Sequence, residues 1–302
     1  MSAVPVASVV SAPRAVVPAP AGPGPTPAPG APREAEAQAD AHQVRSFTRS
    51  LNRSRQSLTR ADRPRTFVLG GREWDLLDEV FAPVYSPSTG VGLDFLGLND
   101  PRPADTGSRE AAVTTAFAPD VSGRRGSFLE IGCGTGVIAV TAALAAHGPV
   151  VACDISPQAV ENTVRNAERH GVQDRLRAVC GDLFGGLDDG ERFDTVFWSS
   201  NYVLGPADYV YESVHERAYV DTGYQAHRRY LEEAPRRTTA SGAALLHFSS
   251  RGDVALLHRI AAESGRELRT LAACLVQEGE YGNDLVEHLL FQILPAPRSH
   301  RA

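Results

Sequence analysis

The segment Phe128-Leu-Glu-Ile-Gly-Cys-Gly-Thr-Gly136 decides the fold, because an apolar strand runs directly into a glycine-rich turn and then into the helical run 137–146. Glycines at positions 132, 134 and 136 let the backbone pass close to a ligand, and the helix that follows begins with unpaired N–H groups. By itself such a turn identifies no particular ligand.

Two features of the turn narrow the choice. Its glycines follow the spacing GxGxG and not the dinucleotide spacing GxGxxG, and Glu130 stands two residues before the first glycine. A carboxylate there would repel a pyrophosphate, whereas it suits a ligand with an ammonium group, such as S-adenosyl-L-methionine (SAM). The segment therefore favours SAM over a nicotinamide dinucleotide.

The next two predicted strands each end in an acid. Val150-Val-Ala-Cys-Asp154 places a carboxylate eighteen residues after Gly136, about where an acid meets ribose hydroxyls. Ser156 is expected to cap the following helix, with Pro157 in its first turn. Ala178-Val-Cys-Gly-Asp182-Leu-Phe184 offers an acceptor for an adenine amino group, with Leu183 and Phe184 expected near the ring.

Strands and helices alternate from Phe128 onward, which predicts an α/β fold with a mostly parallel sheet covered on both faces and a ligand at the carboxyl ends of the strands. The expected strands are 128–131, 149–153, 176–180, 193–198, 243–249, 267–274 and 286–293. The expected helices include 136–146, 157–170, 222–235 and 252–264.

Composition divides the chain into three parts. Residues 1–40 are almost entirely Ala, Pro, Val, Gly and Ser, which predicts a disordered tail. Residues 41–125 form a helical and substrate-side lead-in, and 126–296 the ligand-binding domain. Within the lead-in, 45–65 is rich in arginine, and the spacing of Val44, Phe47 and Leu51 fits an amphipathic helix. This helix is either a solvated element at the domain edge or a contact for an anionic substrate or carrier protein.

Charge and cysteine content exclude several classes. The net charge of −6 argues against a general nucleic-acid-binding surface, although a local basic patch stays open. Four widely spaced cysteines without a CxxC pair predict neither a metal site nor a disulfide framework. No apolar run is long enough for a membrane span and no secretion signal is evident, so we expect a soluble, cytoplasmic protein.

Together, FLEIGCGTG, VVACDISP and VCGDLF resemble, in order and spacing, the first three motifs of class I SAM-dependent methyltransferases. The resemblance implies a Rossmann-like sheet of seven strands whose last strand is antiparallel, with SAM over the glycine-rich turn. It makes Asp154 a ribose ligand and Asp182 an adenine contact. The expected cofactor-binding residues are Glu130, Gly132, Cys133, Gly134, Gly136, Asp154, Ile155, Asp182, Leu183 and Ser199.

Within the class, the chain is most similar to the small-domain group that includes the release-factor glutamine and ribosomal-RNA guanine methyltransferases. Residues 78–87 resemble the substrate-side lead-in of that group, and 155–162 its second helix. There the fourth strand ends in Asn-Pro-Pro-Tyr, which holds a planar nitrogen. Here Ser199-Ser-Asn-Tyr202 keeps only the aromatic residue, so a different nucleophile becomes plausible.

The segment from Tyr202 to Tyr230 holds six of the eight tyrosines and forms either a lid over the acceptor or part of the core. Methyl transfer needs alignment of the nucleophile and removal of its proton. Asn201 and Tyr202 are the candidates for alignment, and His215 or His227 for the base. Asp221 is expected to cap the helix that carries His227.

The leading hypothesis is a SAM-dependent methyltransferase for a small-molecule acceptor, with specialised metabolism as its setting. The alternative is a methyltransferase for a protein side chain or RNA, which would dock on 45–65. A SAM-binding protein without catalysis is a third reading, and a nicotinamide-dependent oxidoreductase is disfavoured by Glu130. The sequence leaves the acceptor atom and the oligomeric state open.

Overall fold

Short, largely apolar strands form the centre of the sheet in the computed structural model, which describes residues 46–99, 126–278 and 284–296. All four residues of β3 (Phe128–Ile131) are buried, as are most of β4 (Val150–Asp154) and β6 (Phe193–Ser199). Strands that are buried on both faces need apolar side chains at consecutive positions. The apolar runs in the sequence therefore predicted these strands to within one residue.

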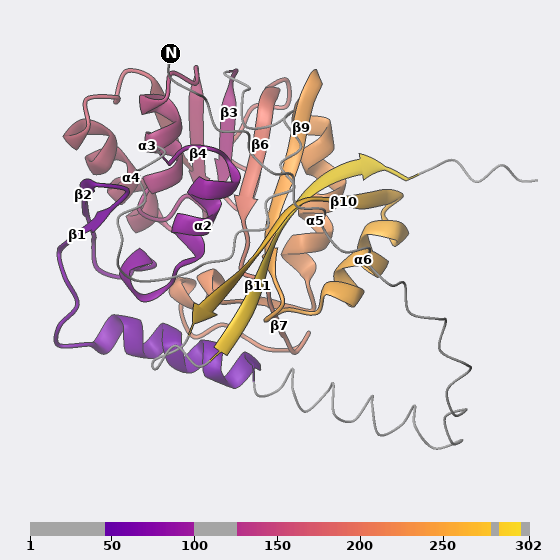
Figure 1. The fold of residues 1–302 in the computed structure, drawn as a ribbon, viewed down its shortest axis with the longest axis horizontal. Helices are drawn as coiled ribbons and strands as arrows, with labels where there is room; N and C mark the ends of the chain where they lie inside the picture. The colour runs from indigo at the N-terminus through magenta and orange to yellow at the C-terminus, as the bar shows by residue number, and fades with distance from the viewer. Residues whose placement is uncertain (1–45, 100–125, 279–283, 297–302) are drawn as a thin grey trace, which may run out of the picture. The chain divides into compact units, whose positions relative to one another are not determined.

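The main sheet has seven strands in the order β10-β11-β9-β6-β3-β4-β5. Strands β3, β4, β5, β6 and β9 run parallel, whereas β11 is antiparallel to both of its neighbours. Figure 1 shows β4, β3, β6 and β9 side by side, with β10 and β11 beyond them. The predicted seven-stranded sheet with an antiparallel last strand is confirmed. The remaining strands of the sheet are β5 (Leu176–Cys180), β9 (Thr238–Ser249), β10 (Arg266–Glu278) and β11 (Asp284–Pro295).

Helices cover both faces of the sheet, and each face has its own apolar cluster. On one face α2 (Ser88–Phe95), α3 (Val137–Leu144) and α4 (Pro157–Arg169) pack with Phe128, Phe197 and Leu245. On the other, α5 (Gln225–Glu233) and α6 (Val254–Glu263) pack with Trp198, Phe248 and Phe291.

Helix α5 begins later than the sequence predicted. Residues Val220–Thr222 form a short strand, β8, that pairs in parallel with β7 (Val203–Gly205). Asp221 nevertheless accepts hydrogen bonds from the backbone N–H groups of Ala226 and His227, in the first turn of α5. The predicted capping role of Asp221 is therefore confirmed, although Asp221 lies in β8 and not directly before the helix.

The part before β3 consists of several small elements. The hairpin of β1 (Thr66–Leu69) and β2 (Arg72–Asp75) is attached to α4, because the side chains of Asn162 and Asn166 bond to the backbone of Asp75. Shorter 3-10 helices lie at Pro83–Tyr85 (η1), Val214–Ala218 (η2) and Ala234–Arg237 (η3).

The arginine-rich stretch forms a helix at 46–59, drawn in indigo in Figure 1. Its Leu51 packs with Val203 and Val220, so this helix lies against the β7–β8 pair. The predicted amphipathic helix is confirmed within the described range, whereas Val44 and the tail 1–40 lie outside the described residues. None of the described helices combines the length and apolar character that a membrane crossing needs.

Candidate active site

The glycine-rich turn after β3 uses the backbone freedom of glycine at three positions. Gly132, Gly134 and Gly136 have φ angles of 66°, 54° and 77°, in the left-handed region. At Gly136 a Cβ atom would also lie 2.9 Å from the Cα atom of Thr163 on α4. The turn therefore requires glycine at 136 for both conformation and space.

Glu130 lies beneath this turn, with only 2% of its surface exposed. Its Oε2 atom accepts a hydrogen bond of 2.8 Å from the backbone N–H of Ala139, in the first turn of α3. Burial raises the pKa of Glu130 well above its usual range. The carboxyl thus stabilises the start of α3, and its contact with an ammonium group stays a prediction.

Asp154 joins the first two motifs at the carboxyl end of β4. It accepts hydrogen bonds of 2.9 Å from the backbone N–H groups of Gly134 and Ser156, one on each carboxylate oxygen. Burial raises the pKa of Asp154 in spite of these bonds. Ser156 in turn accepts a hydrogen bond from Ala159 N–H, which confirms the predicted helix cap, and Pro157 occupies the first turn.

The third acid, Asp182, lies at an exposed position after β5. Its Oδ2 atom is 2.8 Å from Nη1 of Arg229 on α5. The neighbouring Leu183 has a φ of 54° and lines the cavity, as predicted. Phe184 is a correction: it stacks on Tyr230 in the core, with ring centroids 5.7 Å apart, and it does not line the cavity. The side chain of Leu183 therefore points to the cavity, and that of its neighbour Phe184 points to the core.

A cavity of about 1120 Å³ extends from the glycine-rich turn to the helix at 46–59. One wall holds nine of the ten predicted cofactor residues, including Cys133, Ile155 and Ser199, whereas Gly136 does not line the cavity. The opposite wall holds residues 79–81 and 83–89, which confirms the placement of the lead-in segment 78–87 beside the site. The helix at 46–59 contributes Arg53, whose Nε atom has no hydrogen-bond partner among the described residues.

Asn201 and Tyr202 lie in the cavity wall, as the sequence predicted. The amide nitrogen of Asn201 donates to the carbonyl oxygens of Arg217 and Val220, so its Oδ1 atom is left buried and without a partner. Burial, together with nearby Glu278, raises the pKa of Tyr202 to about 12. Asn201 therefore offers a free acceptor, and Tyr202 stays protonated as a donor at neutral pH.

Comparisons with known proteins agree with this geometry. Residues 128–218 match the family model described as "Methyltransferase domain". The chain carries a methyltransferase domain of the class I SAM-dependent kind. The cofactor of this class is S-adenosyl-L-methionine, and the matched residues include the glycine-rich turn.

Among the curated relatives that match parts of this chain, two illustrate the similarity. A release factor glutamine methyltransferase of Cereibacter sphaeroides is 32% identical over 161 residues, which cover 50% of this chain and 54% of the relative. A ribosomal protein L11 methyltransferase of Methylococcus capsulatus is 38% identical over 89 residues, covering 30% and 28%. The chain therefore spans about half, or less, of the relatives that it matches.

A solved structure of a TehB-like SAM-dependent methyltransferase from Corynebacterium glutamicum superposes with a TM-score of 0.38 and 20% identity. The superposition covers 56% of this chain and 80% of that protein.

The two histidines that the sequence offered as bases have different surroundings. His215 lines the cavity, but its Nδ1 atom is 2.8 Å from Oγ of Ser54, which ties η2 to the helix at 46–59. Burial, with Arg63 nearby, lowers the pKa of His215 to about 4. His227 is fully buried, bonded to Asp221 at 2.7 Å and absent from the cavity lining. Because His227 does not reach the cavity, its position does not support the predicted role as a general base.

The tyrosine-rich segment divides between the two expected roles. Tyr202, Tyr211 and Tyr219 line the cavity, whereas Tyr224 and Tyr230 are fully buried in the core. The hydroxyl of Tyr224 donates to the carbonyl of Tyr202, and thus holds the segment between β6 and β7 in place.

Sequence reasoning missed three residues that the sheet brings to Ser199. His247, His288 and Glu278 come from β9, β11 and β10, and they connect to Ser199 through hydrogen bonds. Their spacing along the chain follows no motif, so only the strand register could have predicted the group. The residues that the structure describes contain no cluster of histidine, cysteine and acidic side chains suited to a metal ion.

Proposed function

We propose that the chain transfers the methyl group of SAM to a protein side chain that enters the cavity beside Asn201 and Tyr202. The observation that carries the proposal is one continuous cavity that joins the glycine-rich turn to these two residues. Bound SAM supplies an electrophilic methyl group on a sulfonium. The protein has to hold the cofactor, align the acceptor and exclude water.

The cofactor wall fits SAM in its chemistry. Each carboxylate oxygen of Asp154 has spare lone pairs after its one backbone bond, so it can still accept from ribose hydroxyls. Asp182 and Leu183 offer an acceptor and an apolar contact at the rim for the adenine. We assign the remaining predicted cofactor residues, apart from Gly136, to the same wall, with Ser199 at its boundary to the acceptor side.

Protein is favoured over RNA as the acceptor by the arginines of the lead-in. Arg55 pairs with Glu212, Arg60 pairs with Asp62, and Arg63 donates to the carbonyl oxygens of Leu77 and Val80. The ion-paired Arg55 and Arg60 displace few counterions from a nucleic acid, and the Nη2 atom of Arg63 is already engaged by the two carbonyl oxygens. Both curated relatives also carry names that state protein substrates, a release factor and ribosomal protein L11.

A small-molecule acceptor is the second candidate, because the acceptor side of the cavity has an aromatic lining. Tyr85, Tyr211 and Tyr219 line it, and the helix at 46–59 contributes Arg53 as a cation. Such a chamber suits a small aromatic molecule that carries an acidic group.

The acceptor atom is an O–H or N–H group other than a planar amide in this proposal. Ser199, Ser200 and Asn201 replace the Asn-Pro-Pro run that holds a planar nitrogen in the resembling group. The unpaired Oδ1 of Asn201 is a single acceptor and suits one O–H or N–H donor.

The test uses the full chain, SAM with a radioactive methyl group, and cell extract from the host that encodes the protein. We expect label in acid-precipitable material that protease releases and ribonuclease does not. Label that passes an ultrafilter would replace the proposal by the small-molecule reading, and ribonuclease-sensitive label by the RNA reading. Asp154→Ala is the matched control, because it should bind SAM weakly and transfer no label. An absence of transfer by a wild-type chain that binds SAM would overturn the proposal.

A further inference from the structure

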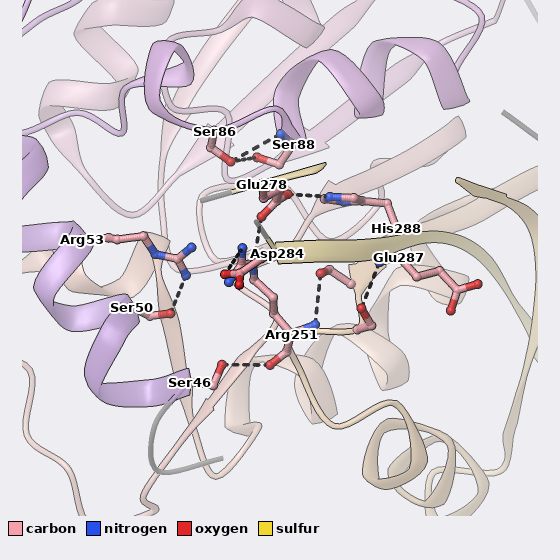
Figure 2. Close-up of polar contacts among 12 residues, drawn as sticks. Ser46, Ser50, Arg53, Ser86, Ser88, Arg251, Glu278, Asp284, Glu287 and His288 are labelled. Carbon is pink, nitrogen blue, oxygen red and sulfur yellow. Dashed lines mark hydrogen bonds and ion pairs between the residues drawn. The ribbon is translucent and has the colours of Figure 1, made fainter. Parts of the chain in front are cut away.

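A continuous run of hydrogen bonds crosses four neighbouring strands behind the cavity. Ser199 Oγ at the end of β6 is 3.1 Å from Nδ1 of His247 on β9, and Nε2 of His247 is 2.9 Å from Nδ1 of His288 on β11. Nε2 of His288 is 2.7 Å from Oε1 of Glu278, at the end of β10. Glu278 in turn accepts from Nε of Arg251 at 2.7 Å. Figure 2 shows the Arg251–Glu278–His288 part of this run.

The two ends of the run face the cavity, whereas its middle is sealed. Ser199 and Glu278 both line the cavity. His247 and His288 are 1% and 0% exposed, and the ring of Phe95 on α2 packs edge-on against His247. Water therefore has no access to the imidazoles, and a proton can move between them only along the hydrogen bonds.

The carboxylate of Glu278 determines which atom donates and which accepts in every hydrogen bond of the run. Burial acts to raise the pKa of Glu278, but the bonds from His288 and Arg251 outweigh it, so the pKa lies below its ordinary value. An ionised Glu278 requires His288 to donate from Nε2 and accept at Nδ1. His247 then donates from Nε2 and accepts at Nδ1, and Ser199 donates its hydroxyl proton to His247. Burial and His288 also lower the pKa of His247 well below its usual value, consistent with one proton on its ring.

We propose that Ser199 is the catalytic residue that takes the proton from the methyl acceptor, and that His247, His288 and Glu278 are positioning residues that orient Ser199 and carry the proton away. The inference rests on the proposed methyl transfer. With its own proton directed at His247, the Ser199 oxygen presents its lone pairs to the acceptor's O–H or N–H group.

The step balances within the chain's own residues. The acceptor's lone pair forms the new bond to the methyl carbon while the carbon–sulfur bond breaks and its electron pair stays on sulfur. The acceptor's proton passes to Ser199 as the Ser199 proton passes to Nδ1 of His247. The Nε2 proton of His247 moves to His288, and the Nε2 proton of His288 moves to Glu278. After the product leaves, the same transfers run in reverse, and Ser199 releases the proton to water.

The kinetic test compares Ser199→Ala with Ser127→Ala, at a serine before β3 that donates to Asp194, does not line the cavity and takes no part in the run. We expect Ser199→Ala to lower kcat about 10²-fold, the lower end of the range for a general base, with KM and SAM affinity within about threefold. Ser199→Thr, which keeps the hydroxyl, should recover at least roughly a tenth of the wild-type kcat. Wild-type kcat in Ser199→Ala would overturn the proposal.

A second measurement does not depend on the acceptor. Proton NMR of the full chain should show two strongly downfield, slowly exchanging imidazole N–H signals, from His247 and His288. Glu278→Gln should shift or remove both, because an amide can no longer impose the direction of the bonds. Spectra without such signals in the wild type would refute the run itself. Failure of methyl transfer by the wild type, with the signals present, would instead refute the proposed function.

Discussion

The two walls of the cavity are built in different ways. Apart from Ser199 at its boundary, the cofactor wall comes from one stretch, 130–183, in which three consecutive strands of the parallel sheet each end in residues that line the cavity. The acceptor wall draws on the helix at 46–59, the segment 79–89, the end of β6, η2, and Glu278 at the end of β10. Local turn and strand chemistry therefore builds the first wall, and long-range packing builds the second.

The buried ionisable groups differ as well. The cofactor wall holds two buried acids, Glu130 and Asp154, which bond to backbone N–H groups. The acceptor wall and the layer behind it hold buried histidines, His215, His247 and His288, which bond to side chains. Burial lowers the pKa of His215 and of His247, so these two histidines make the acceptor side sensitive to acid.

The largest expected effect concerns the rigidity of the cofactor wall. Gly136→Ala forces a left-handed conformation on alanine, about 1–2 kcal/mol, and drives its Cβ atom against Thr163, about another 1–3 kcal/mol. We expect a loss of unfolding free energy of about 2–5 kcal/mol in chemical denaturation, from these two terms together. The matched control is Gly171→Ala, where φ is 67° but no atom lies within 4 Å of an added Cβ. Equal losses in both variants would show that the contact with Thr163 adds nothing.

The next effect tests the link between the two motifs of the cofactor wall. Asp154→Ala removes the acceptor of two backbone N–H groups and the predicted ribose contact, and we expect SAM affinity to fall about 100-fold, equivalent to about 3 kcal/mol. Calorimetric titration with SAM measures it. Asp182→Asn is the control, because this exposed acid pairs with Arg229 at the rim, and it should weaken binding by less than about 1 kcal/mol. A greater loss at Asp182 would shift the main cofactor contact to the rim.

The smallest effect concerns the acid sensitivity of the acceptor wall. His215 has a folded pKa of about 4, below its unfolded value, so its contribution to stability is present above about pH 6.5 and is lost as the pH falls toward 4. Between pH 7 and pH 5 we expect unfolding free energy to fall by about 2 kcal/mol from this residue alone.

Chemical denaturation at the two pH values compares the wild type with His215→Gln, which can still bond to Ser54 and has no charge to gain. The pH dependence should be smaller in the variant by that amount. The raised pKa of Glu130 has the opposite sign, because stability from a buried neutral acid is present at low pH and is lost as the pH rises. Acid should therefore loosen the acceptor wall while the cofactor wall keeps its structure. Identical pH profiles in wild type and variant would refute the contribution of His215.

Much of the fold was predictable because local patterns specify it. Four-to-seven-residue apolar runs located the central strands, and Ser156 with Pro157 located the start of α4. The start of α5 was less predictable, because Asp221 caps it from inside β8. The sequence pattern of a capping acid before a helix does not specify how many residues separate the two.

The cofactor site was predictable for the same reason, whereas the acceptor site was only partly so. Asn201 and Tyr202 were found because they directly follow a strand at a position with a known role in related motifs. His227 was chosen for its residue type and lies in the core, where Trp198 and Tyr224 pack against it. Residue type alone does not say which face of a helix a side chain occupies.

The sequence by itself determined the order of strands and helices, the glycine-rich turn with its acids, and thereby the cofactor class. Each of these features depends on one strand or helix and the turn beside it, where strand ends and turns impose the geometry. Only the tertiary structure decided that Ser199, His247, His288 and Glu278 lie on adjacent strands, with β11 inserted between β9 and β10. Hydrogen bonds between such residues depend on strand order and register, which the packing of the whole sheet selects and no local pattern encodes.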